Sequence, residues 1–262
     1  MNKKNLSDLV IRQSEFKGDM GVARTDVTPP AGIYARSWGS AMHDAAEGIH
    51  RPLYATCLFL RGGDPQLELY LLCLDLGWWY DNAHEREIRT RIVEKAGIRD
   101  DRLIVHMGHT HSGPASNLQN VERQGGHLIP PYRDKVVDAC AAAITGAKVN
   151  AQPAVASWAY GRCDLARNRD LVLDSETFLC SVNPDGPSDD TVLVGRVTDA
   201  GGRIMATMVN YACHPVSLGG GNKLISPDYY GAMREVVERD TDGAPCLFLH
   251  GASGDMTPLR SY

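Results

Sequence analysis

The sequence predicts an α/β fold: mixed β-sheets flanked by helices, in a single layered domain with a site at the C-terminal ends of its strands. Apolar runs with strand spacing alternate with helical patterns between residues 53 and 147, as is typical of α/β chains. After residue 151 strand patterns dominate, and 262 residues are enough to bury a sizeable core. We therefore expect one domain spanning residues 1–262.

The N-terminal part of the chain contains a short helix, a strand and a β-hairpin. The pattern indicates a helix over 7–17, and apolar and polar residues then alternate over 21–28 until two prolines stop the strand. Residues 33–50 are expected to form a loop. Two apolar runs, 53–61 and 67–76, flank the turn sequence Gly-Gly-Asp-Pro and predict a β-hairpin.

Strand and helix alternate in the centre of the chain. Apolar residues recur at helical spacing over 82–96, where Gly97 provides a stop, and again over 132–147. The strand between these helices covers 102–107. The later elements are, in order, strands over 154–160 and 177–182, a hairpin of 191–198 and 203–213, a glycine-rich loop over 217–226, a helix over 227–240 and a final strand over 245–249.

The composition argues against several classes of protein. Hydrophobic residues make up 43% and charged residues 23%, which argues against disorder or a coiled coil over the whole chain. The net charge of −5, without a basic block, argues against a nucleic-acid binder, so a small-molecule partner is expected. The seven cysteines form no CxxC pair, which disfavours a disulfide scaffold. Because neither a signal peptide nor a membrane-spanning apolar stretch is recognised, we expect a cytoplasmic enzyme.

The strongest signal is the turn Gly108-His109-Thr110-His111, which follows an apolar strand pattern. Alternate residues of a strand share a face, so two imidazoles two residues apart can converge on one zinc-like ion. His214 also follows a strand pattern, and sites in α/β sheets collect beyond the C-terminal ends of strands. The three predict a His₃ metal site, which can lower the pKa of bound water to about 7. The alternatives are histidines at a polar strand end and, for His214, a capped loop beside a proline.

Other side chains could take part in the chemistry. Asp75, Asp228 and Asp255 are candidate ligands, partners of ligands or general bases; turn or cap chemistry is the alternative for each, most strongly for Asp228, which opens a helix. Arg169 could bind a carboxylate or an oxyanion, or form a surface salt bridge. Thr257 could be an activated hydroxyl or a turn residue before a proline.

Many of these segments, in the same order, resemble the N-terminal catalytic domain of the neutral/alkaline non-lysosomal ceramidase family, over nearly the whole chain. The matching segments are residues 21–29, 48–55, 74–75, 109–114, 168–169, 210–215, 226–228 and 254–258. The resemblance implies a zinc amidase in which His109, His111 and His214 hold one Zn²⁺ per chain. Metal-activated water would attack the amide of an N-acylsphingosine, a lipid acyl substrate.

The resemblance also implies roles for residues around the metal. Arg169 would hold the polar head of the substrate, and Thr257 occupies the place of a family serine near the scissile bond. We therefore expect Thr257, Asp255 and Arg169 to be catalytic. Substrate binding is expected from Arg169 together with His50 and Gly39 of the early loop.

Two departures from the family leave alternatives open. Thr257 adds a stiff β-branched methyl to the hydroxyl of the family serine. The family also takes a glutamate and a tyrosine from further downstream as zinc ligands, and neither maps to a position up to Tyr262. Either the chain is a fragment, or another subunit or different residues complete the site. The functional alternatives are hydrolysis of a different soluble ester, amide or sugar-derived substrate, and a non-catalytic metal-binding remnant.

Overall fold

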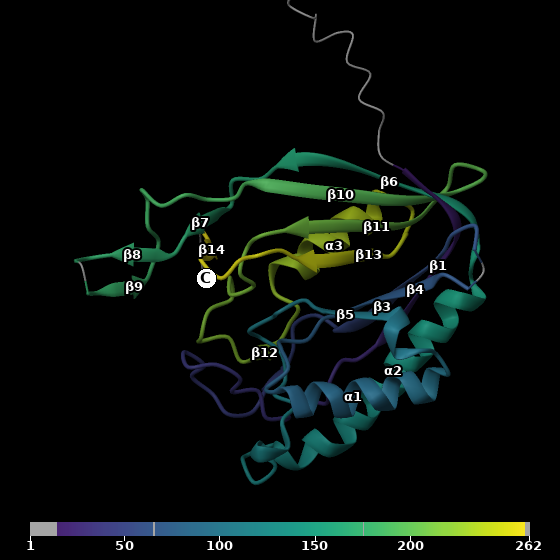
Figure 1. Ribbon diagram of the computed structural model, residues 1–262. Coiled ribbons are helices and arrows are strands. Elements are labelled where there is room, and N and C mark those ends of the chain that lie inside the picture. The colour runs from purple at the N-terminus through teal and green to yellow at the C-terminus, as the bar shows by residue number, and fades with distance from the viewer. Residues whose placement is uncertain (1–14, 65, 175, 260–262) are drawn as a thin grey trace, which may run out of the picture.

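One strongly curled sheet of eight strands forms the centre of the computed structural model, which describes residues 15–64, 66–174 and 176–259 (Figure 1). Its strands are β1 (Glu15–Asp26), β3 (Tyr54–Arg61), β4 (Glu68–Leu74), β5 (Leu103–Met107), β6 (Gln152–Arg162), β10 (Thr191–Asp199), β11 (Ile204–Tyr211) and β13 (Cys246–His250). Their order is β13-β11-β10-β6-β1-β3-β4-β5, in which the outermost pairs are parallel and the inner pairs antiparallel. The predicted α/β fold with a mixed sheet is confirmed.

The sheet folds over so that its two edge strands meet. Leu58 on β3 packs in one buried cluster with Val197 on β10 and Leu247 on β13, so both halves of the sheet enclose a common core. At the sheet edges, the backbone N–H of His250 on β13 donates to Nε2 of His106 on β5 over 2.7 Å. The C-terminal ends of β5 and β13 therefore lie side by side, although these strands stand first and last in the sheet order.

Three helices pack against the curled sheet. Helices α1 (Asn82–Ala96) and α2 (Ile129–Val149) lie together beneath β1, β3 and β4, and their buried apolar side chains join the core on that face (Figure 1). Helix α3 (Tyr229–Arg239) packs on β13, where the ring of Tyr230 stacks on Phe248 with centroids 4.5 Å apart. The helices thereby cover β1, β3, β4 and β13, whereas Tyr160 on β6 and Val194 on β10 are exposed.

Short pairs of strands hold those loops. In the described part of the chain, β2 pairs with β12 in parallel, whereas β7 pairs with β14 and β8 with β9 in antiparallel fashion. The hairpin of β8 and β9 protrudes from the body of the molecule (Figure 1). The short elements are β2 (Gly48–Ile49), η2 (Asp100–Arg102), η3 (Leu118–Asn120), η4 (Gly126–Leu128), β7 (Ala166–Asn168), β8 (Asp170–Val172), β9 (Phe178–Cys180), β12 (Leu224–Ile225) and β14 (Met256–Pro258).

Most elements expected from the sequence are present, with small shifts at their ends. Both hairpins are confirmed, and α1 occupies the predicted range 82–96 and ends at Gly97, whose φ of 65° is easily adopted by glycine. The helix expected over 7–17 is wrong at residues 15–17, which belong to β1 and pair with β6. The remaining part of that prediction, 7–14, lies outside the described residues.

Three smaller differences concern short strands. The loops expected over 33–50 and 217–226 contain β2 and β12, the strand expected over 177–182 is confined to β9, and β7, β8 and β14 were not expected. Each of these strands has only two or three residues, too few for a residue pattern to indicate. None of the helices formed by the described residues combines the length and the apolar character needed to cross a lipid bilayer.

Candidate metal centre

The chain turns sharply between the end of β5 and the first histidine of the cluster. A Cβ added at Gly108 would lie 2.3 Å from the hydroxyl oxygen of Tyr230, so this position requires glycine. His109 then adopts a φ of 62°, in a left-handed region that few non-glycine residues adopt. Since β5 has ended at Met107, His109 and His111 converge through this turn and not through strand alternation, which corrects the reason for expecting them to meet.

Three imidazoles form a compact cluster at this turn. The side chains of His109, His111 and His214 each offer a ligand atom, and these atoms lie within 4.8 Å of one another. Nε2 of His111 is 3.0 Å from Nε2 of His214, and the ring centroids of the three histidines are 4.8–5.1 Å apart. The structure therefore brings together the three residues that the sequence singled out.

Burial keeps these imidazoles neutral at physiological pH. It is the main cause that lowers the pKa of His111 to about 3 and that of His214 to about 4, and it also lowers the pKa of His109. Neighbouring imidazoles and the charge of Arg169 lower the pKa values of His111 and His214 further. Only the neutral form of histidine can bind a metal, so the cluster is in the protonation state that a ligand set requires.

The cluster fits a zinc-like ion in its donor chemistry. Nδ1 of His214 lies 3.0 Å from the carbonyl oxygen of Ser253, so a proton on Nδ1 leaves a lone pair on Nε2. Two nitrogens bound to one tetrahedral zinc ion lie about 3.3 Å apart. The observed 3.0 Å between the Nε2 atoms of His111 and His214 is close to that separation. Nδ1 of His111, the ring nitrogen that would face away from such an ion, is buried and has no hydrogen-bond partner among the described residues.

Two tryptophans that the sequence analysis did not single out line the cluster. The ring of Trp38 meets His111 edge-on with centroids 4.7 Å apart, and Trp78 lies 5.2 Å from His109 and 5.1 Å from His111. Gly39, expected to bind substrate, follows Trp38 in an exposed turn with open space around it. The two indoles supply apolar walls, which strengthen electrostatic interactions at the cluster.

A fourth imidazole was also missed. His250, at the end of β13, stacks flat on His109 with an interplanar angle of 10° and a centroid distance of 5.1 Å. Its Nε2 makes a very short contact with the hydroxyl oxygen of Ser253. The available signal was that His250, like His109 and His214, directly follows an apolar strand pattern.

Arg169 lies next to the cluster. Its backbone N–H donates to the carbonyl oxygen of Asp255 and its Nε donates to that of Gly254, both over 2.8 Å. After burial, the charge of Arg169 is a further cause that lowers the pKa values of the three clustered histidines. A polarised carbonyl or an anion bound at the cluster would therefore be stabilised by this guanidinium group.

Thr257 and Asp255 lie in the adjoining turn. Thr257 is half-buried on β14, where it pairs with Arg167 on β7, whereas Asp255 is exposed just before β14. This pairing joins the turn to the strand that leads into Arg169. The catalytic roles of Thr257 and Asp255 stay predictions of the sequence.

His50 lies outside the cluster. It is exposed, and its Nδ1 is 3.3 Å from the hydroxyl oxygen of Ser226. The carbonyl oxygen of Ser226 accepts a hydrogen bond of 2.7 Å from the hydroxyl of Thr110. His50 is thus connected to the His-Thr-His turn through Ser226, and its substrate-binding role stays a prediction.

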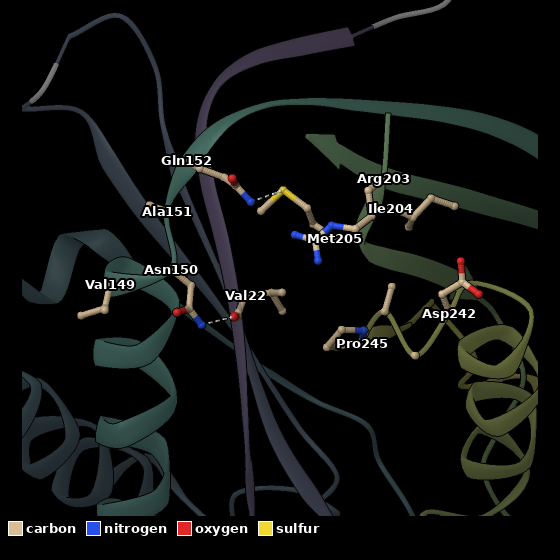
Figure 2. A pocket seen from close by; sticks show the side chains of 12 residues that line it. Val22, Val149, Asn150, Ala151, Gln152, Arg203, Ile204, Met205, Asp242 and Pro245 are labelled. Carbon is tan, nitrogen blue, oxygen red and sulfur yellow. Dashed lines mark hydrogen bonds between the residues drawn. The ribbon is translucent and has the colours of Figure 1, made fainter. Parts of the chain in front are cut away.

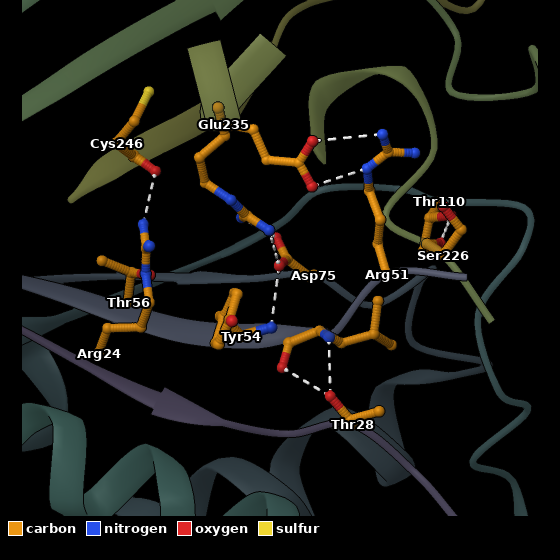
Figure 3. A network of polar contacts seen from close by, with 12 residues as sticks. Arg24, Thr28, Arg51, Tyr54, Thr56, Asp75, Thr110, Ser226, Glu235 and Cys246 are labelled. Atoms are coloured by element: carbon orange, nitrogen blue, oxygen red, sulfur yellow. Dashed lines mark hydrogen bonds and ion pairs between the residues drawn. The ribbon is translucent and has the colours of Figure 1, made fainter. Parts of the chain in front are cut away.

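The two buried aspartates have structural partners. Asp75 accepts a hydrogen bond of 2.9 Å from the backbone N–H of Tyr54 (Figure 3). It accepts another, also of 2.9 Å, from Nη1 of Arg234. The carboxylate of Asp228 accepts from the hydroxyl and backbone of Ser217 and from two further backbone N–H groups, one of them at the start of α3. Asp75 is therefore engaged in an ion pair, and the capping interpretation of Asp228 is confirmed.

A cavity of about 530 Å³ lies at the opposite ends of the strands, where β11 and β13 begin (Figure 2). Asn150, Arg203 and Asp242 are among the residues that line it. Asn150 already donates to the carbonyl oxygen of Val22 over 3.0 Å. None of the three clustered histidines lines this cavity, so it is separate from the candidate metal centre.

Comparison with known proteins finds relatives for almost the whole chain. Residues 19–258 match the family described as neutral/alkaline non-lysosomal ceramidase, N-terminal. The crystal structure of neutral ceramidase from Pseudomonas aeruginosa is 21% identical, with a TM-score of 0.73 over 93% of this chain and 40% of that one. A structure described as a ceramidase complexed with C2 is 23% identical, with a TM-score of 0.74 over 93% of this chain and 39% of that one. The chain thus spans about two fifths of the length of both structures, and the likeness shows a shared fold.

Proposed function

Since this chain belongs to the neutral/alkaline non-lysosomal ceramidase family, we propose that it is a zinc-dependent hydrolase of amide bonds with an N-acylsphingosine or a similar N-acyl compound as substrate. The observation that carries the proposal is the cluster of three neutral imidazoles, one buried and two half-buried, whose ligand atoms lie within 4.8 Å of one another. His109, His111 and His214 would hold the metal. A zinc ion so held would polarise a carbonyl and lower the pKa of water.

The chain's own residues would orient the substrate. Arg169 presents a fixed positive charge, because its Nε and backbone N–H are anchored on the carbonyl oxygens of residues 254 and 255. Such a charge stabilises an oxyanion that develops at the scissile carbonyl. Trp38 and Trp78 would exclude water from one side of the cluster, since both rings contact His111. Thr257, in the adjoining turn, would donate a hydrogen bond to the substrate.

A lipid acyl substrate is supported by the surface beside Arg169. The hairpin of β8 and β9 starts at the residue after Arg169. Its large apolar side chains are exposed, because nothing in the described part of the chain covers them. Leu173 is 57% and Phe178 64% exposed, and Val172 and Leu179 are exposed as well. Exposed apolar side chains on both faces of a hairpin are available for contact with a membrane, an apolar ligand or another protein, and a lipid acyl chain is the apolar ligand that fits the proposed activity.

The zinc content of the purified 262-residue chain tests the metal site. We expect about one zinc per chain in the parent and almost none in the His109→Ala/His111→Ala double variant. His127→Ala, at an exposed position remote from the cluster, is the matched control and should keep its zinc. A parent that binds no zinc would contradict the proposal.

Hydrolysis of a long-chain N-acylsphingosine, beside a short soluble N-acyl compound, tests the substrate. We expect faster turnover of the long-chain compound, and a selective loss of that preference in Phe178→Glu/Leu179→Glu. Turnover of the short compound alone would favour a soluble substrate. Bound zinc without turnover of any acyl compound would favour a non-catalytic metal-binding protein.

A further inference from the structure

Ser253 connects two imidazoles at the edge of the candidate metal centre. Its side chain is 3% exposed, and its hydroxyl oxygen lies very close to Nε2 of His250 and 3.3 Å from Nδ1 of His214. Its backbone carbonyl lies 3.0 Å from the same Nδ1 of His214. One serine thus contacts a member of the three-histidine cluster through both its carbonyl and its hydroxyl.

His250 reaches the opposite side of the cluster. Its ring lies flat on His109, and its backbone N–H donates to Nε2 of His106 over 2.7 Å. The strand with His106 leads into His109 and His111, whereas His214 follows β11, the neighbour of β13 in the sheet. Contacts of His250 and Ser253 therefore join the two chain segments that supply the three imidazoles.

We propose that His250 and Ser253 form a clamp that positions the metal-binding histidines. The hydroxyl of Ser253 donates to Nε2 of His250, which fixes the Ser253 carbonyl where it accepts from Nδ1–H of His214. That bond selects the tautomer of His214 with a free Nε2, and the flat face of His250 fixes the ring plane of His109. The role of the clamp in zinc binding rests on the proposed function. Partners of metal-binding histidines typically change metal affinity by about 10–100-fold.

Other roles for these two residues fit the geometry less well. His250 is not a fourth ligand, since its Nε2 is engaged by Ser253 and its ring lies against the face of His109. Ser253 is not placed as a nucleophile, because its side chain is buried and its hydroxyl points between two imidazoles. Both residues therefore act through the histidines that they contact.

Three variants separate the elements of the clamp. His250→Phe keeps a flat ring on His109 but removes the acceptor for Ser253, and Ser253→Ala removes one oxygen atom while keeping the backbone carbonyl. His250→Gln restores an acceptor of similar reach. His84→Phe is the control, because His84 is also a buried histidine but lies in the first turn of α1, outside the cluster, where its backbone N–H donates to the capping side chain of Asp81.

The first measurement is the zinc dissociation constant, obtained by competition with a chelator. We expect zinc binding to weaken about 10–100-fold in His250→Phe and about tenfold in Ser253→Ala. His250→Gln keeps an acceptor for Ser253 but loses the ring that stacks on His109, so it should bind zinc more tightly than His250→Phe and less tightly than the parent, whereas His84→Phe should bind zinc like the parent. Visible absorption of the cobalt-substituted proteins should change in His250→Phe and recover in part in His250→Gln, which a purely structural role would not produce.

The second measurement needs no metal. Imidazole ¹⁵N chemical shifts of the zinc-free protein should show the His214 proton on Nδ1 in the parent and a mixture of tautomers in His250→Phe. Zinc affinity and tautomer both unchanged in His250→Phe and Ser253→Ala would overturn the clamp. If the parent bound no zinc but the tautomer shift appeared, the metal proposal would fail and the clamp would stand. Should His250→Phe not fold, the single-atom change in Ser253→Ala decides.

Discussion

Two groups of polar side chains lie at the C-terminal ends of the neighbouring strands β4 and β5, and they differ in whether their polar atoms have partners. Next to β4, Asp75 and Arg234 form an ion pair whose side chains are 8% and 6% exposed, and a backbone N–H completes the partners of Asp75 (Figure 3). Next to β5, the three-histidine cluster directs its nitrogens at one another, and Nδ1 of His111 is buried without a partner. The satisfied pair holds the fold together, whereas the unsatisfied cluster is available to a ligand.

Breaking the ion pair should have the largest effect. Arg234→Ala leaves the carboxylate of Asp75 buried without its charged partner, so we expect the zinc-free protein to lose about 3–5 kcal/mol of unfolding free energy. Urea denaturation followed by circular dichroism measures this loss. Arg239→Ala, in the same helix with an exposed partner, is the control and should change stability by less than about 1 kcal/mol. A similar small loss for Arg234→Ala would mean that the pair is not structural.

Removing a histidine of the cluster should affect zinc binding and hydrolysis more than the free energy of unfolding. His111→Ala removes a metal ligand, and we expect zinc binding to weaken at least tenfold and hydrolysis to be abolished. The zinc-free variant should lose less unfolding free energy than Arg234→Ala, because the change removes ring contacts with Trp38 and Trp78 but leaves no buried charge without its partner. Chelator competition and urea denaturation on the same samples test both halves. Full zinc affinity in His111→Ala would exclude His111 as a ligand.

Acid should distinguish the two regions further. Burial lowers the pKa values of His111 and His214 to about 3 and 4, below the value of about 6.5 in an unfolded chain. The unfolded state therefore binds protons first, so the zinc-free protein keeps this stability above about pH 6.5 and loses it progressively toward pH 4. We expect a shallower loss in His111→Phe/His214→Phe. Equal pH dependence of unfolding in parent and variant would show that these imidazoles are not buried in neutral form.

The positions of the cluster residues could be predicted because His109, His111 and His214 each follow an apolar strand pattern, and the C-terminal ends of strands are where α/β sheets place their sites. The backbone conformation that brings these three histidines together could not be predicted. It depends on the left-handed turn at His109, which replaces the regular alternation that the spacing suggested. A residue pattern contains no information on a single φ angle of a non-glycine residue.

The residues that surround the three-histidine cluster could not be predicted from the sequence either, for a related reason. His250 contacts His109 because the sheet curls until its first and last strands meet, whereas Trp38 reaches His111 from the loop before β2. These contacts join residues separated by 141 and 73 positions (250 − 109 and 111 − 38). Strand periodicity indicates which face of a strand is buried but not which distant strand will cover it.

The smallest effect on activity is expected at Thr257, which tests how far chemistry at the three-histidine cluster depends on neighbouring residues. If zinc-activated water is the nucleophile, Thr257→Ala removes only a hydrogen bond to the substrate, and we expect kcat to fall about tenfold with zinc affinity unchanged. If the hydroxyl itself attacks the amide, turnover should disappear completely. Thr257→Ser keeps the hydroxyl and removes the β-branched methyl, so it should retain parent activity in either case. A complete loss in Thr257→Ala with recovery in Thr257→Ser would move the nucleophile from the metal to this turn, and would make the cluster a support for chemistry at Thr257.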